Sequence, residues 1–258
     1  ENKDGRIVLI FPLLDKVIVG TSDTPINDAD EARCTEEEVD YFFEMIERVF
    51  PNIKIKKEQI IFRFSGVRPL EYSHAKTAGQ ITRDHSIKED NLGNMPVYSL
   101  VGGKWTSYRA FSEQITDKVL SFLHRIRTTD TKRLPIGGGR DYAAMLDTPE
   151  GNTSLFKRYG SRYREIIDYH TGENIPLRKY PEMTCREIIF LVDKEKIVHL
   201  DDLILRRSLM AYLGHLTRPL VDELANILAE VLDWSDTQKQ AEVDRAINIL
   251  QDRHEVYL

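Results

Sequence analysis

The stretch 99–109 carries the strongest chemical pattern in this sequence of 258 residues. It reads SLVGGKWTSYR, in which an apolar, β-type segment meets Gly102, Gly103 and Lys104 and then the start of a predicted helix. Glycine lets a ligand approach the backbone closely, and the first amide groups of a helix lack helical partners and attract negative charge. The pattern predicts a site for an anionic or electron-rich ligand. A tight turn with a solvated lysine is the alternative.

Two arginines are the next candidates. Arg68 follows a predicted strand and precedes a proline, which keeps it extended, and Arg83 lies in the segment QITRDH. The planar guanidinium group suits phosphate or carboxylate, although a single arginine is more often solvated or structural. Arg68, Arg83 and Lys104 all fall at or near the end of a predicted sheet segment. Together they predict a pocket that encloses a phosphate group.

Other familiar catalytic patterns are missing from the sequence. It contains no HExxH, GKS/T, GxSxG or GxGxxG motif. His74 and His85 lie near the arginines, and His85 is a candidate base because a neutral imidazole titrates near working pH, but a structural or surface role is the stronger interpretation. Cys34 and Cys185 belong to no CxxC pair, so neither a metal site nor a disulfide framework is predicted.

Composition narrows the class of protein. Lys and Arg number 36 against 42 Asp and Glu, a net charge of −6 that argues against nucleic-acid binding. No apolar run is long enough to cross a membrane, and the first residues lack the basic region of a signal peptide. We therefore expect a globular protein in a reducing, cytoplasmic setting.

The candidate residues need a scaffold, which the first part of the chain supplies. Segments 5–11 and 16–21 predict a β-hairpin, and Thr35 with Glu38 forms a capping box for a helix that Pro51 ends. Further strands are predicted at 60–67 and, buried, at 96–101.

A polar loop is expected between these two strands, and a long helix follows the glycines. Its predicted buried stripe consists of Tyr108, Phe111, Ile115, Val119 and Phe122. Residues 1–126 are thus predicted to form an α+β unit with a mixed or antiparallel sheet.

The second part of the chain has helical patterns. Residues 127–139 are polar and rich in glycine, which predicts a linker. Residues 140–258 predict an all-α domain, with a capping box at Thr184 and helices at 201–213, at 220–232 and from Ser235 onward.

These motifs, in their order and spacing, resemble the FAD-dependent glycerol-3-phosphate dehydrogenases over nearly the whole chain. The similar segments are GTSDT at 20–24, SGVRPL at 65–70, ITRD at 81–84, GGKWTSYR at 102–109 and LPIGG at 134–138. Two further segments, YGS at 159–161 and LRRS at 205–208, resemble marks of the family's C-terminal helical domain.

The resemblance implies a reaction and a role for each candidate residue. In that family a hydride passes from C2 of sn-glycerol 3-phosphate to FAD, dihydroxyacetone phosphate forms, and the electrons pass to a quinone. The resemblance implies that Arg68 and Arg83 are catalytic and that both, with Lys104, bind the substrate phosphate. The residues implied to contact the flavin are Gly102, Gly103, Lys104, Trp105 and Thr106.

The sequence also departs from the family pattern, because the GxGxxG dinucleotide-binding half is missing. We therefore expect the C-terminal part of such an enzyme, which needs that half as a partner and by itself is inactive and does not retain FAD. Ser22, Trp105 and Ser107 replace the usual Thr, Leu and Thr, and no DxDxDG calcium loop follows, which suggests a bacterial type. The whole enzyme is expected to be a homodimer, cytoplasmic or peripheral to the inner face of the membrane.

Three alternatives stay open. One is the related oxidase, which passes electrons to oxygen, and a second is a flavin amine oxidoreductase, which the three cations disfavour because they suit a phosphorylated substrate. The third is a helical interaction module formed by residues 140–258. Its last 58 residues carry six Lys or Arg and eleven Asp or Glu, which argues against binding to anionic lipid.

Overall fold

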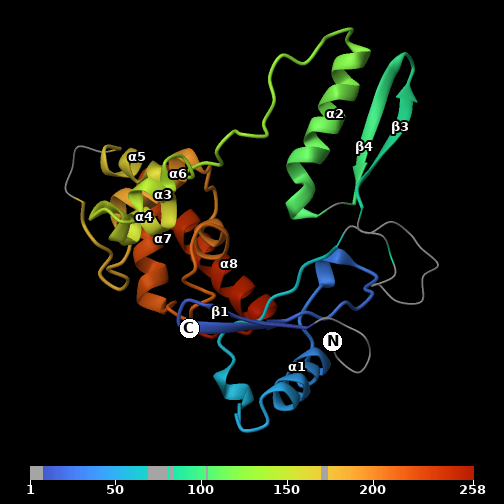
Figure 1. The fold of residues 1–258 in the computed structure, drawn as a ribbon. Helices are drawn as coiled ribbons and strands as arrows, with labels where there is room; N and C mark the ends of the chain where they lie inside the picture. Colours follow the sequence, from blue (N-terminus) through green and yellow to red (C-terminus); the bar gives the residue numbers. More distant parts are fainter. Residues whose placement is uncertain (1–7, 69–80, 82–83, 103, 170–173) are drawn as a thin grey trace. The chain divides into compact units, whose positions relative to one another are not determined.

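The computed structural model describes residues 8–68, 81, 84–102, 104–169 and 174–258. This part of the chain divides into two compact units, described separately below (Figure 1).

Unit 1 takes the described parts of Glu1–Ser22, Glu31–Ser65 and Gly137–Leu258, and unit 2 takes those of Asp23–Asp30 and Gly66–Ile136. Residues 31–65 thus share a unit with the helical region, a grouping that the sequence did not predict. The predicted domains, 1–126 and 140–258 joined by a linker at 127–139, stay a prediction.

A β-hairpin in unit 1 agrees with the predicted one. β1 (Leu9–Leu13) pairs antiparallel with β2 (Lys16–Gly20), and Leu13 lies opposite Lys16. Pro12 lies inside β1 instead of ending it. A two-stranded sheet leaves one edge of each strand without a ladder, where a residue lacking an N–H group is tolerated.

Helix α1 (Glu36–Val49) begins at the predicted capping box. The Thr35 hydroxyl accepts a hydrogen bond from the Glu38 amide at 3.3 Å, and the Glu38 carboxylate accepts one from the Thr35 amide at 2.9 Å. All three residues of the first turn are acidic, which complements the positive end of the helix dipole.

The segment 60–67, predicted as a strand, forms none and has no strand partner among the described residues. Phe62 of this segment packs against the helical core instead. The ring of Phe62 stacks on His254 at 4.4 Å and lies 4.5 Å from the ring of Tyr212. The prediction was wrong because an apolar, β-branched pattern does not supply a strand partner, and here Phe62 contacts the helical region through its side chain.

Arg63 in this segment forms ion pairs with residues far apart in the sequence. Its Nη1 atom lies 2.5 Å from Glu36 in α1 and 3.0 Å from Glu255, just beyond the last helix. The Arg63 amide donates to the carbonyl of His254 at 3.3 Å, and the Arg63 carbonyl oxygen lies 2.7 Å from Nδ1 of the same histidine. Residues 61–64 therefore tie α1 to the C-terminal region.

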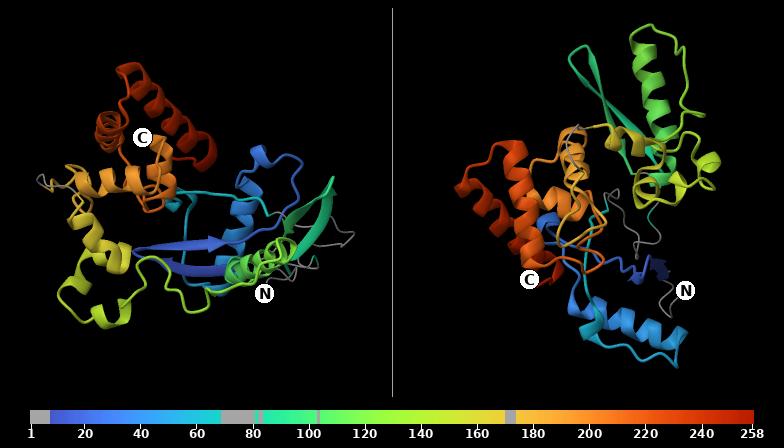
Figure 2. Two further views of the ribbon diagram at one scale, coloured as in Figure 1. Left: turned by 90° about the horizontal axis from the view of Figure 1, so that it is seen from above. Right: turned by 90° about the vertical axis from the view of Figure 1, so that its left-hand side faces the viewer.

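The rest of unit 1 is helical, and the all-α character of this region agrees with the prediction. Its α-helices are α3 (Tyr142–Met145), α4 (Ser154–Tyr159), α5 (Tyr163–Ile167), α6 (Cys185–Lys194), α7 (Arg218–Leu232) and α8 (Asp236–His254). Figures 1 and 2 show α7 beside α8, and α7 also contacts α6. No helix in the described chain is long and apolar enough to cross a membrane.

The core of unit 1 is continuous. Among its fully buried side chains are Ile188 in α6 and three leucines of α7, Leu220, Leu224 and Leu228. Helix α8 contributes Val243, Ala246 and Leu250, and it starts at a capping box formed by Ser235 and Gln238. Phe62 packs against this same core from outside the helical region.

Two helical features differ from the prediction. Residues 201–213 form one π-helical turn, Asp202–Arg206, followed by turns instead of a full helix. At Thr184 only half of the capping box forms: the Glu187 amide donates a hydrogen bond to the Thr184 hydroxyl. The other half is missing because the Glu187 carboxylate binds Arg158 and Tyr159. A buried ion pair thus competes successfully with the local cap.

A second buried carboxylate, Asp201, joins the π-helical turn to α8. Its oxygens accept hydrogen bonds from Arg206 at 2.8 Å and from Arg245 at 2.9 Å, and only 1% of the residue is exposed. Burial raises the pKa of Asp201, but the hydrogen bonds from Arg245 and Arg206 outweigh that effect, so the pKa lies below its usual value.

Unit 2 contains a second hairpin and one helix, which lie side by side in Figures 1 and 2. β3 (Ser86–Leu92) pairs antiparallel with β4 (Met95–Val101), and α2 (Tyr108–Phe122) follows. β3 falls in the predicted loop, because its charged sequence, SIKEDNL, conceals a strand with both faces largely exposed.

The predicted burial in unit 2 is also corrected. β4 is a mostly exposed strand, and in the predicted stripe of α2 only Phe111 is fully buried. Tyr108 is 52% exposed and Phe122 is 47% exposed. The apolar residues are where the pattern placed them, but most of them are only partly covered within the described chain.

The first part of the predicted linker is held on α2 by polar contacts. Arg127 lies 2.9 Å from Asp117 and 3.3 Å from Glu113, and Arg109 contacts both Glu113, at 2.5 Å, and Thr131, at 3.3 Å. Residues 127–131 are therefore attached to unit 2 although they bring few apolar side chains.

We expect Phe62→Ala to lower the free energy of unfolding of unit 1 by about 2 kcal/mol, because it removes a partly buried ring from His254 and Tyr212. Urea unfolding followed by tryptophan fluorescence measures this loss, since Trp234 packs against the unit 1 core. Phe64→Ala is the matched control, because Phe64 is 50% exposed and its loss should cost less than about 1 kcal/mol. Equal losses would contradict the role given to Phe62.

We expect Asp201→Asn to destabilise unit 1 by about 2 kcal/mol at neutral pH, since two arginines lose their buried counter-charge. A carboxyl whose folded pKa is lowered stabilises the fold above its unfolded pKa, and this contribution is lost as pH falls through the folded value. The difference between the wild type and the variant should therefore shrink below about pH 4. Asp222→Asn removes an exposed ion pair with Arg218 and is the control. A difference independent of pH would refute this account.

Candidate functional site

The glycine turn that the sequence singled out follows β4 directly in unit 2. Gly102 has a φ of +69°, and a Cβ atom there would lie 3.0 Å from the carbonyl oxygen of Asp84. Both the backbone conformation and the close approach therefore require glycine. Gly103 lies outside the described residues.

A short 3-10 turn, Trp105–Ser107, stands between these glycines and α2. The Ser107 hydroxyl accepts a hydrogen bond from the Lys104 amide at 3.2 Å, and the Ser107 amide donates to the Lys104 carbonyl at 3.0 Å. Among the described residues the amides of Trp105 and Thr106 have no hydrogen-bond acceptor. Two open N–H groups ahead of a helix suit an anion or an electron-rich ring edge.

Side chains around this turn are open to solvent. Lys104 is exposed and forms no ion pair within the described chain, so its ammonium group is available to a ligand. The side chain of Trp105 is 93% exposed, and Thr106 is exposed as well. A large apolar ring gains nothing from contact with water, so its position favours a contact with a group outside this chain.

Arg68 is held by an acidic partner. Its Nη1 atom lies 2.7 Å from Oδ2 of Asp23, and the arginine side chain stays 39% exposed. The pair joins two segments that the sequence treated separately, 20–24 and 65–70, and sequence reasoning did not assign Asp23 a role. The acidic residue within the GTSDT motif was the available signal.

The remaining candidates divide into two groups. Arg83 and His74 lie outside the described residues, so the predicted phosphate pocket of three cations stays a prediction. His85 stacks on Phe111 at 4.3 Å, and its Nε2 atom lies 3.1 Å from Oε1 of Gln114. These contacts to α2 support the structural interpretation of His85. No group of three or more potential metal ligands occurs in the described part of the chain.

The sequence is similar to one family model and to several curated proteins. Residues 129–239 match the family model of the C-terminal domain of alpha-glycerophosphate oxidase. The probable mitochondrial glycerol-3-phosphate dehydrogenase of Dictyostelium discoideum is 29% identical over 97% of this chain and 42% of its own length. The glycerol-3-phosphate dehydrogenase of Synechocystis is 32% identical, over 81% of this chain and 40% of its own.

A solved structure extends the comparison to the fold. The X-ray structure of the glycerol-3-phosphate dehydrogenase from Bacillus halodurans complexed with FAD matches 98% of this chain and 52% of its own, with a TM-score of 0.78 and 22% sequence identity. The chain is homologous to the FAD-dependent glycerol-3-phosphate dehydrogenases. This confirms the predicted family and the predicted fold class of small antiparallel sheets with helices and a helical C-terminal region.

The chain spans about half the length of the curated glycerol-3-phosphate dehydrogenases it matches, and it corresponds to their C-terminal portion. The segment that matches the family model contains α3 to α7 and the start of α8, all in unit 1. The candidate residues Arg68, Gly102 and Lys104 lie in unit 2, outside that segment.

Proposed function

We propose that this chain, together with a dinucleotide-binding half, oxidises sn-glycerol 3-phosphate to dihydroxyacetone phosphate with FAD as the hydride acceptor. The observation that carries the proposal is the turn after β4, where Gly102 has a positive φ, two amides are open and Lys104 is unpaired. This combination suits a phosphorylated substrate beside an electron-rich ring.

Each candidate residue has a role that follows from its chemistry. Lys104 and Arg68 provide positive charge for the substrate phosphate, and the ion pair with Asp23 orients the guanidinium group of Arg68. By resemblance Arg83 is the third cation, and Arg68 and Arg83 face the substrate. The open amides of Trp105 and Thr106 are suited to hold the flavin edge on which negative charge collects. FAD, when bound, supplies the redox chemistry.

The exposed apolar surface of unit 2 supports the need for a partner half. Leu92 is 72% exposed, Met95 is 60% exposed and Trp105 is 93% exposed, while α2 has a single fully buried residue. An isolated two-stranded hairpin is marginally stable in water and needs a further layer on its apolar side. We therefore assign these faces to contact with the dinucleotide-binding half.

The electron acceptor has two candidates. A quinone is the acceptor that the sequence resemblance favours, and it would place the whole enzyme at the inner face of the cytoplasmic membrane as a peripheral protein. Oxygen is the second candidate, because the matching family model describes a domain of alpha-glycerophosphate oxidase. Hydrogen peroxide release during turnover, compared with reduction of a soluble quinone, distinguishes the two.

We expect the 258-residue chain alone to retain no FAD, because one turn of backbone contacts is too small a surface to hold a dinucleotide. The visible spectrum of the purified chain should lack a flavin band near roughly 450 nm. Adding the dinucleotide-binding half of a relative and FAD should restore the band. A stoichiometric band from the chain alone would refute the expectation.

In the complete enzyme we expect Arg68→Ala and Lys104→Ala each to reduce kcat/KM for glycerol 3-phosphate about 30-fold, or roughly 2 kcal/mol, since each removes a charge-assisted bond to an anion. Steady-state kinetics at fixed ionic strength measures the loss. Lys132→Ala, an exposed lysine of unit 2, is the matched control. Wild-type kinetic constants in either variant would remove that residue from the site.

A further inference from the structure

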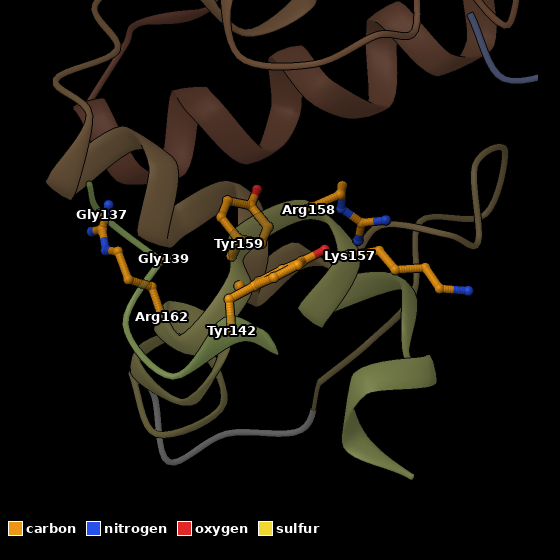
Figure 3. A pocket seen from close by; sticks show the side chains of 9 residues that line it. Gly137, Gly139, Tyr142, Lys157, Arg158, Tyr159 and Arg162 are labelled. Carbon is orange, nitrogen blue, oxygen red and sulfur yellow. The ribbon is translucent and has the colours of Figure 1, made fainter. Parts of the chain in front are cut away.

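A pocket in unit 1 remains without a role in the proposed function. Its volume is about 390 Å³, and it is lined by the glycine run 137–139, by Tyr142 and Tyr159 and by three cations, Lys157, Arg158 and Arg162 (Figure 3). No acidic side chain lines it. It is formed by the two family-like segments 134–138 and 159–161, which the proposed reaction does not use.

These two segments meet through a contact between glycine backbones. Gly138 has a φ of +83°, and a Cβ there would lie 2.2 Å from the carbonyl oxygen of Tyr159. Gly160 has a φ of +57°, and its Cβ would lie 2.0 Å from the carbonyl oxygen of Gly138, which accepts a hydrogen bond from the Ser161 amide at 2.9 Å. Neither glycine can be replaced without moving the backbone, so the shape of the pocket wall is fixed.

The glycine run also offers unused donors. Within the described chain the amides of Gly137 and Gly138 donate no hydrogen bond. Successive amide groups next to a glycine with positive φ form concave sites that bind anions. The backbone of this wall therefore suits an anionic ligand.

The three cations differ in how far their charges are balanced. Arg158 is committed to the buried carboxylate of Glu187, at 2.9 and 2.7 Å. Arg162 lies next to Gly137 in Figure 3, and its partners are Glu165 at 3.2 Å and Glu195 at 3.5 Å.

The Glu165 side chain is 55% exposed and that of Glu195 is 34% exposed, so both pairs with Arg162 are weak and can yield to a ligand. Lys157 forms no ion pair among the described residues. Of the three cations, Lys157 alone has no carboxylate partner among the described residues.

We propose that this pocket binds a phosphate group, either inorganic phosphate or the phosphate of a small monoester, beside Gly137, Gly138 and Arg162, which lie together at one end of it (Figure 3). A phosphate group accepts several hydrogen bonds at once and suits both backbone amides and guanidinium. The pocket has room for a small ester next to Tyr142. The proposal does not depend on the proposed oxidation, whose candidate residues lie in unit 2.

The test is a titration of the chain labelled with 15N-glycine, which contains only 14 glycines and therefore few amide signals. Inorganic phosphate and glycerol 2-phosphate are added separately at constant ionic strength. We expect saturable shifts of the Gly137 and Gly138 signals, with Gly214, elsewhere in unit 1, unchanged. Tighter binding of glycerol 2-phosphate would identify an ester as the ligand, and equal or weaker binding would identify free phosphate.

Arg162→Gln should weaken the affinity at least about threefold. Lys157→Gln should weaken it less, because the Lys157 side chain points away from Gly137 and Arg162 in Figure 3. Lys196→Gln, an 82% exposed lysine of unit 1, is the control and should leave it unchanged. The Gly214 signal reports whether each variant is folded. Absence of saturation at Gly137 and Gly138 in the wild type, or wild-type affinity in the folded Arg162→Gln variant, overturns the proposal.

The same spectra separate this proposal from the proposed function. Gly102 reports the candidate substrate site of unit 2, and Lys104→Gln should alter only its response. Saturation at Gly102 without saturation at Gly137 and Gly138 would overturn the second phosphate site and leave the proposed oxidation standing. Saturation at Gly137 and Gly138 alone would support the second phosphate site, while the proposed oxidation, which needs the dinucleotide-binding half, is tested by the kinetics of the complete enzyme.

Discussion

The architecture of unit 1 depends on the segment 61–64, which contacts α1 on one side and the C-terminal region on the other through charged and aromatic side chains. Arg63, whose side chain is only 10% exposed, pairs with Glu36 at the start of α1 and with Glu255 after α8, and Phe62 beside it stacks on His254. Burial lowers the pKa of His254, which favours the neutral form of its ring. Together with the ion pair of Arg33 and Asp252, at 2.6 Å, this segment connects the region of α1 to the helical core.

Local signals in the sequence predicted local structure well. The capping box at Thr35, the start of the last helix at Ser235 and the β1–β2 hairpin need only a few neighbouring residues, and all three form. The strand predicted at 60–67 does not form, because a strand needs a distant partner and the sequence pattern does not reveal one. The full capping box predicted at Thr184 is incomplete for a related reason. The Glu187 carboxylate binds Arg158, which lies 29 residues away in the sequence.

The same distinction applies to the candidate site. Gly102 and Lys104 were found because their chemistry is contained in one short run, and the positive φ at Gly102 explains why glycine is needed there. The pairing of Asp23 with Arg68 spans 45 residues and was missed. The close contact of Gly138 with Gly160 was missed as well, although both glycines stand in segments that the family resemblance had singled out.

The tie between Arg63 and Glu255 spans 192 residues and has a consequence for biosynthesis. The chain passes between the two units four times, so neither unit is one continuous piece of sequence. At ordinary translation rates roughly 10 to 40 seconds separate the synthesis of Arg63 from that of Glu255. During this interval residues 61–64, with the rings of Phe62 and Phe64, lack their C-terminal contacts on the nascent chain. This segment is therefore the one that a chaperone would most usefully bind.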